Sequence, residues 1–233
     1  MAFCFILFSF FVGFCLYARR FNNPYKLIFI FGKKGAGKSM YMCRCMLKDL
    51  KKGWTVYTDI QDINIPGVRI IKDSHELAKF RPCENSALYL DEVGISFDNR
   101  SFKTFDAGLR DFFKLQRKYR CKVIMNSQSF DIDKKIRDVT DSMILMQNIM
   151  NCIAICRPIR RTITLTEPSA DSESRIADRL RFTGIFSWKI FWMPKYHKYF
   201  NSFDAPYREE LKYIEVPEVL DHEVLAESSD APM

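Results

Sequence analysis

The first residues of the chain form its longest apolar segment. Residues 1–18 contain no charged side chain, and Arg19 and Arg20 follow at once. As an α-helix this segment would be about 27 Å long, close to the roughly 30 Å hydrocarbon core of a bilayer. Because basic residues follow the segment and none precedes it, the pattern predicts a single-pass anchor with the body in the cytoplasm. A buried element and a cleaved signal peptide are the alternatives, but a signal peptide would need a basic stretch before its apolar residues.

Shorter apolar runs of strand length recur after this segment, and helix-compatible stretches separate the earlier ones. This alternation predicts an α/β fold in which a mainly parallel sheet is flanked by helices. The runs are residues 26–31, 54–59, 68–71, 86–90 and 121–125, then three β-rich runs at 141–147, 151–156 and 160–166.

The first run leads into a phosphate-binding motif. Residues 32–39 read GKKGAGKS, match G-x-x-x-x-G-K-[ST], and lie between a predicted strand and a predicted helix, which is the context that the motif of a P-loop NTPase requires. Its glycines let successive N–H groups face a phosphate. We expect Lys38 to reach the β and γ phosphates of ATP and Ser39 to bind Mg²⁺. The predicted nucleotide-binding residues are Gly32, Lys33, Lys34, Gly35, Ala36, Gly37, Lys38, Ser39 and Met40.

A second motif consists of two acids after the run 86–90. In nucleotide-hydrolysing folds such a strand is expected beside the first one. Asp91 would then join Ser39 as a ligand of Mg²⁺, and Glu92 would polarise the attacking water. Acids at a strand end are also common in solvated turns, so the placement after an apolar run is what favours the catalytic interpretation.

Polar residues also end the run 121–125. Asn126, Ser127 or Gln128 could contact the γ-phosphate or the water, and we favour Gln128; ordinary strand-end hydrogen bonding is the alternative. Basic residues lie on either side of this run. Arg117 or Arg137 could act at a neighbouring subunit's γ-phosphate, and we assign Arg137 to the catalytic set, although a solvated basic face would have the same pattern.

The composition changes toward the C-terminus. Residues 182–203 combine aromatic side chains with lysines. This composition suits contact with a membrane interface, another subunit or single-stranded DNA. The alternative is that these residues form strands or a helix that covers the ATPase core. Six acidic residues and no Lys or Arg lie between Glu215 and the end, which predicts a disordered tail. The predicted parts are an anchor at 1–20, a P-loop ATPase domain at 21–167, an aromatic-basic extension at 168–214 and an acidic tail at 215–233.

The charge and the cysteine content indicate which partners, metal sites and disulfides to expect. The chain of 233 residues has 36 basic and 28 acidic residues, a net charge of +8 that favours polyanionic partners. Its eight cysteines have no paired C-x₂-C spacing and there are three histidines, so we expect neither a zinc site nor disulfides.

Three motifs together resemble the zonular occludens toxin-like ATPases, the assembly and export proteins of filamentous phages. They are GKKGAGKS, ALYLDEVG and VIMNSQSFDIDKKIRD, within residues 26–165. The resemblance implies an ATPase of the host cytoplasmic (inner) membrane that helps to extrude virions, forms a homo-oligomeric ring, and contacts phage coat or assembly proteins. Single-stranded DNA could be a further partner. The family's roles would fall on Lys38, Ser39, Asp91, Glu92, Gln128 and Arg137.

Two other functions remain open, and one feature departs from the family. Many members place their membrane helix after the ATPase domain, whereas the apolar segment here is N-terminal. A DNA-translocating or packaging ATPase of another mobile element would share every catalytic residue, and DNA would strongly stimulate its hydrolysis. A nucleotide-gated membrane scaffold would function unchanged after Glu92→Gln.

Overall fold

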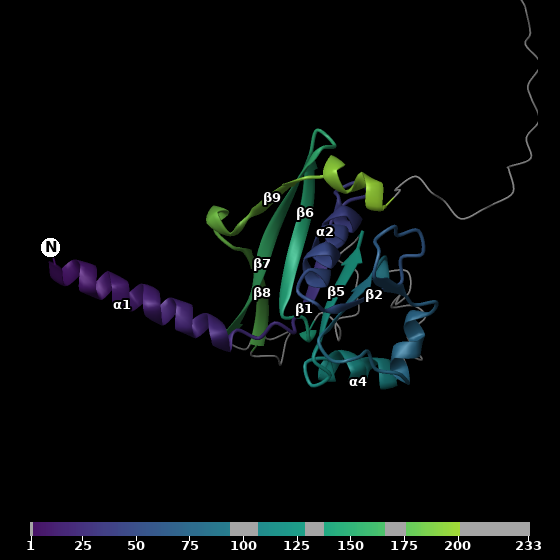
Figure 1. Ribbon diagram of the computed structural model, residues 1–233, viewed down its shortest axis with the longest axis horizontal. Helices are drawn as coiled ribbons and strands as arrows, with labels where there is room; N and C mark the ends of the chain where they lie inside the picture. Colours follow the sequence, from purple (N-terminus) through teal and green to yellow (C-terminus); the bar gives the residue numbers. More distant parts are fainter. Residues whose placement is uncertain (1, 94–106, 129–137, 166–175, 201–233) are drawn as a thin grey trace, which may run out of the picture. The chain divides into compact units, whose positions relative to one another are not determined.

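The computed structural model of the chain describes residues 2–93, 107–128, 138–165 and 176–200 (Figure 1). Arg137, the linker at 167–174 and the predicted acidic tail lie outside the described residues. The predicted domain boundaries therefore stay predictions.

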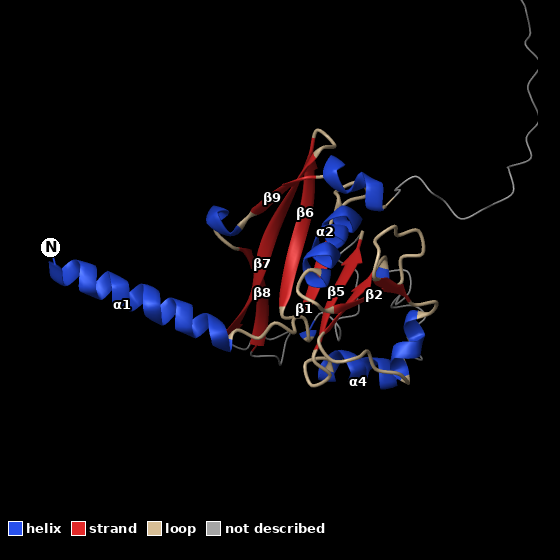
Figure 2. Cartoon of the chain, viewed as in Figure 1, coloured by secondary structure: helices blue, strands red, loops and turns tan. Residues whose placement is uncertain are grey.

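The described strands form one nine-stranded sheet (Figures 1 and 2). Six of them are parallel and confirm the predicted mainly parallel α/β sheet. In spatial order these are β3 (Val68–Ile70), β2 (Thr55–Thr58), β4 (Ser86–Leu90), β5 (Cys121–Ser127), β1 (Leu27–Phe31) and β6 (Ser142–Ile149). The antiparallel strands are β7 (Ile153–Leu165), which pairs with β6, and then β8 (Ile176–Phe182) and β9 (Lys189–Trp192), which both pair with β7.

Two helices cover the two faces of the sheet. Side chains of a strand alternate between faces, so Ile30 of β1 packs with α2 (Lys38–Leu50), while Phe29 packs with α4 (Ala107–Leu115). Both Ile30 and Phe29 are fully buried. The short helix η2 (Ser74–Ala78) lies against α4. Each face thus has its own apolar core, and the strand ends stay free to hold polar side chains.

The N-terminal segment is helical, as predicted. The helix α1 (Ala2–Ala18) continues into a short 3₁₀ turn, η1 (Arg19–Phe21). Residues Cys4–Phe21 have a mean hydropathy of 1.6, and none of this window is buried inside the structure. The segment is therefore long and apolar enough to cross a membrane.

Two expectations about the strands were wrong. β4 does not lie beside β1, because β5 pairs with both and separates them. The runs 151–156 and 160–166 are parts of one strand, β7, which continues through Pro158. A proline lacks an N–H for the ladder, but on that edge β9 pairs only up to Cys156 and β8 pairs only from Ile159, so Pro158 occupies the gap between the two partners.

The aromatic segment after β8 contributes to the core. Phe191 of β9 and the following Met193 are buried in the cluster formed by α2. The chain then forms η5 (Pro194–Tyr199), which lies against α2. For these residues the core-covering interpretation is correct. Other aromatic residues of the segment are exposed: Trp192 at the end of β9, and Phe186 in the short helix η4 (Ile185–Ser187).

Candidate nucleotide-binding site

The phosphate-binding motif forms the predicted turn between β1 and α2. Gly35 and Gly37 have φ angles of +78° and +84°, the left-handed region that favours glycine. Gly37 is the N-cap of α2, and its carbonyl accepts from the N–H of Tyr41 at 2.9 Å. The helix therefore begins at Lys38, and its N-terminal N–H groups and partial positive charge lie at the loop.

Lys38 lies across this loop. Its side chain is 6% exposed, and Nζ donates to the carbonyl oxygens of Gly32 at 3.0 Å and Lys33 at 3.3 Å. Burial lowers the pKa of Lys38, whereas the nearby charges of Glu92 and Asp91 raise it. The ammonium group is thus held close to the place where a phosphate would bind, by bonds that a phosphate oxygen could replace.

Ser39 and Asp91 provide two oxygen ligands that suit Mg²⁺. Ser39 Oγ donates to Asp91 Oδ2 at 3.4 Å, which brings the start of α2 next to the end of β4. Burial raises the pKa of Asp91, and the charge of Glu92 raises it further. Among the described residues no three His, Cys, Asp or Glu side chains form a metal-binding group. Mg²⁺ usually takes one or two protein ligands and completes its shell with water and phosphate, so this pair fits that ion.

Glu92 is held by Asn126 at the end of β5 and by Gln128 directly after it. Its N–H donates to Asn126 Oδ1 at 2.9 Å, and Gln128 Nε2 donates to Glu92 Oε1 at 3.0 Å. The φ of Glu92 is +45°, a conformation that costs a non-glycine residue energy and often marks a functional site. Asn126 of the interposed strand β5 thus fixes the backbone of Glu92, and Gln128, directly after β5, fixes its carboxylate.

Asp59 is a site residue that the sequence pattern did not single out. It follows β2, and its Oδ1 accepts from the N–H of Asp91 at 2.8 Å. Burial raises its pKa to about 7; the charge of Asp91 also raises it, while the hydrogen bond from Asp91 acts in the opposite direction. Asp59 and Asp91 line an open pocket of about 330 Å³, together with η2 residues. The only signal in the sequence was an acid at the end of the run 54–59.

Residues far along the chain enclose the loop. Asn148 Nδ2 of β6 donates to the carbonyl of Gly35 at 2.6 Å. A Cβ at Gly37 would clash with Sδ of Met193, and a Cβ at Gly32 would clash with the carbonyl of Met146. The loop is therefore packed against the β6–β7 hairpin and the end of β9, a wall that no local motif indicates.

The structure brings Lys38, Ser39, Asp91, Glu92 and Gln128 together. Lys33 and Lys34 are exposed in the loop, whereas Met40 is buried in the first turn of α2. Arg137 lies outside the described residues, so no position is assigned to it. The catalytic and ligand roles of these residues stay predictions that their arrangement makes reasonable.

Several solved structures have a similar fold. The N-terminal domain of zonular occludens toxin from Neisseria meningitidis is 16% identical over 76% of this chain and 98% of that one, with a TM-score of 0.49. The genome packaging NTPase B204 of Sulfolobus turreted icosahedral virus 2, in complex with AMP, is 15% identical over 55% of this chain and 78% of that one, with a TM-score of 0.42. The flagellar accessory protein FlaH of Methanocaldococcus jannaschii is 15% identical over 57% of this chain and 76% of that one, with a TM-score of 0.44.

No model of a protein family matches the sequence, and no curated protein matches it. These similarities concern the fold alone, and no property of those proteins is carried over to this chain. Any function must therefore be inferred from the residues of the site.

Proposed function

We propose that this protein is a membrane-anchored, Mg²⁺-dependent ATPase that supports the assembly and extrusion of filamentous phage virions through the host cytoplasmic membrane. The observation that carries the ATPase assignment is the 3.4 Å contact between Ser39 Oγ and Asp91 Oδ2, with Glu92 next in the chain. This contact supports the proposal because Ser39 belongs to the phosphate-binding turn, and the two oxygens suit a cation next to the candidate base Glu92.

Each residue of the site would have a distinct role. The N–H groups of the loop would bind the phosphates, and Lys38 would exchange its bonds to Gly32 and Lys33 for bonds to β and γ phosphate oxygens. Mg²⁺, bound by Ser39 and Asp91, would neutralise charge on the phosphates. Glu92 would accept a proton from the attacking water, and Gln128 would orient its carboxylate.

The assignment to virion export rests on two other features. The three motifs resemble the phage assembly family, and α1 is long and apolar enough to anchor the body to a membrane. The same resemblance supports a homo-oligomer in which Arg137 acts on the nucleotide of a neighbour. It also supports phage coat or assembly proteins as partners.

ATP hydrolysis by the full chain in detergent tests the ATPase assignment. We expect turnover with Mg²⁺ and none with EDTA, and a loss of about 100-fold or more in Lys38→Ala and in Glu92→Gln. Lys79→Ala and Glu84→Gln are matched controls, because both side chains are exposed and lie outside the site. Unchanged turnover in Glu92→Gln would contradict the assigned base.

Virion release tests the biological role. Cells that carry the phage genome with Glu92→Gln should accumulate coat protein and release few virions, while the control Glu84→Gln releases normal numbers. Normal release from the Glu92→Gln phage would favour the nucleotide-gated scaffold instead. Binding of ATP by the purified variant shows whether the site is still folded.

A further inference from the structure

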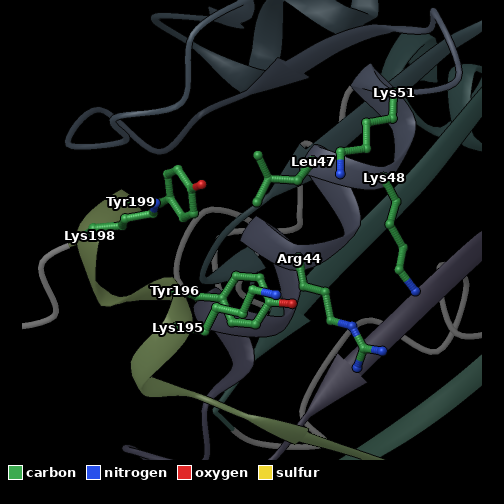
Figure 3. A pocket seen from close by; sticks show the side chains of 8 residues that line it. All are labelled: Arg44, Leu47, Lys48, Lys51, Lys195, Tyr196, Lys198 and Tyr199. Atoms are coloured by element: carbon green, nitrogen blue, oxygen red, sulfur yellow. The ribbon is translucent and has the colours of Figure 1, made fainter.

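A second concave site lies on the outer side of α2, away from the nucleotide-binding residues. It is a pocket of about 260 Å³ between α2 and η5. Figure 3 shows the side chains that line it: Arg44, Leu47 and Lys48 from α2, Lys51 directly after α2, and Lys195, Tyr196, Lys198 and Tyr199 from η5. We call this the α2–η5 pocket.

The α2–η5 pocket is strongly basic. Five of its eight lining residues are Lys or Arg, and none is acidic. Within the described ranges, no ion pair joins any of these five cations to a carboxylate. Asp49, which is also on α2, is 2% exposed and is paired with Lys122 and Lys52. Five cations gathered without compensation favour a ligand with several negative charges.

Arg44 has a covered hydrogen-bond donor beside this pocket. Its guanidinium lies over the ring of Phe191, with its carbon 5.3 Å from the ring centroid. Its NH1 atom is covered and has no hydrogen-bond partner among the described residues. A covered donor without a partner is costly, and a small rotation of the guanidinium would offer this donor to an anion in the pocket.

Two tyrosines complete the lining. Tyr196 and Tyr199 are half-buried, and the ring of Tyr196 meets that of Phe191 edge-on, with centroids 5.8 Å apart. Lys198 Nζ lies 4.9 Å from the centroid of Tyr199. Aromatic rings among cations are typical of sites where bases stack while the phosphates bind Lys and Arg.

We infer that the α2–η5 pocket binds single-stranded nucleic acid. The cations contact successive phosphates, and Tyr196 and Tyr199 stack against bases. A lipid surface fits less well, because the tyrosines are half-buried in a concavity instead of projecting from the surface. The ligand site is separate from the hydrolytic site, although α2 begins at Lys38 and carries Arg44 further along.

Fluorescence anisotropy with a labelled thymidine oligonucleotide, without nucleotide, tests the inference on the full chain in detergent. Lys48→Gln/Lys195→Gln removes one cation from each side of the pocket, and we expect at least 10-fold weaker binding. For single strands the slope of log Kd against log salt is about 0.7 per phosphate contact, so the double variant should lower the slope by about 1.4. Lys114→Gln/Lys118→Gln is the matched control, because both lysines are exposed and lie outside the pocket.

Two further comparisons identify the ligand. Tyr196→Leu should weaken binding of the oligonucleotide but not of an abasic strand of the same length. Equal binding by Lys48→Gln/Lys195→Gln and the unaltered chain would overturn the inference. A second outcome would also overturn it. If Lys48→Gln/Lys195→Gln no longer bound phosphatidylglycerol vesicles but bound the oligonucleotide as before, the pocket would be a lipid site. Lys38→Ala should lose ATP hydrolysis yet bind the oligonucleotide normally. A failure of the ATPase assignment can therefore be distinguished from a failure of the nucleic-acid inference.

Discussion

Gln128 donates a hydrogen bond of 3.0 Å from Nε2 to Oε1 of Glu92. Gln128 directly follows β5, and Glu92 lies just beyond the end of β4, the strand that pairs with β5. The amide therefore restrains the carboxylate that we propose as the base. Its contribution can be measured separately from ATP binding, because Gln128 itself is exposed.

We expect Gln128→Ala to lower kcat for ATP about 10-fold and to leave KM nearly unchanged, since a free carboxylate samples unproductive orientations. Steady-state hydrolysis at saturating Mg²⁺ measures both constants. Gln147→Ala is a control on another exposed glutamine, whose side-chain oxygen accepts from Arg157 and makes no bond to Glu92 in the described part of the chain. A large rise in KM with constant kcat would place Gln128 in ATP binding instead.

Asp59→Ala should reduce both stability and hydrolysis, because it leaves the half-buried N–H of Asp91 without its acceptor. The expected loss in the free energy of unfolding is about 1–3 kcal/mol, measured by urea denaturation. Asp59→Asn keeps an acceptor oxygen and should be much milder. An equal loss in both variants would show that the charge of Asp59, and not its acceptor, matters.

The same residue predicts a pH dependence. Burial raises the pKa of Asp59 to about 7 in the folded chain, against about 3.9 when unfolded. Its stabilising contribution is complete below pH 4 and is lost as the pH rises to about 7. Asp59→Asn should therefore gain stability relative to the unaltered chain between pH 4 and 7. A constant difference across this range, in EDTA and without nucleotide, would contradict the shift.

The sequence predicted the chemistry of the site better than its surroundings. Lys38, Ser39 and Asp91 belong to short motifs whose spacing reflects a local turn or a strand end. Their meeting could be predicted without knowledge of strand order. The strand order itself depends on long-range pairing, which a pattern of apolar residues does not specify. β5 therefore separates β4 from β1 against expectation.

The residues that were missed all act across strands. Asp59 bonds the backbone of Asp91, Asn148 bonds the loop at Gly35, and Met193 packs against Gly37. Each has an ordinary sequence context, and its role depends on which elements are neighbours in space. The runs 151–156 and 160–166 join in one strand through Pro158 for a related reason, since a proline interrupts a strand only where its missing N–H is needed.

Gly37→Ala should destabilise the chain more than Gly35→Ala. Both glycines have left-handed backbone angles, so both substitutions cost about 1–2 kcal/mol. A Cβ at Gly35 meets nothing within 4 Å, whereas one at Gly37 clashes with Met193. The clash should add about 1–3 kcal/mol. Urea unfolding of Gly37→Ala, Met193→Ala and the double variant should reveal a coupling between them, and additive losses would show that they do not touch.

Cys83 should be alkylated first among the thiols of the body at pH 8. Burial raises its pKa, but hydrogen bonds with Thr55 and Tyr57 and the charge of Arg69 outweigh this and lower it overall. Burial instead raises the pKa of Cys43 and Cys156 to about 12. Mass spectrometry after brief iodoacetamide treatment measures the order of labelling. Early modification of Cys43 in the folded chain would contradict this order.

The contact between Met193 and Gly37 also affects when the protein can first bind nucleotide. A ribosome makes the chain from its N-terminus, so the phosphate loop emerges long before β9 and the methionine that encloses it. Until β7 has paired with β6 and then accepted β9, one wall of the loop is missing. The helix α1 leaves the ribosome before the loop and before β9. Nascent chains therefore present their apolar helix while their nucleotide site is still incomplete, and the site is complete only after β9 has been made.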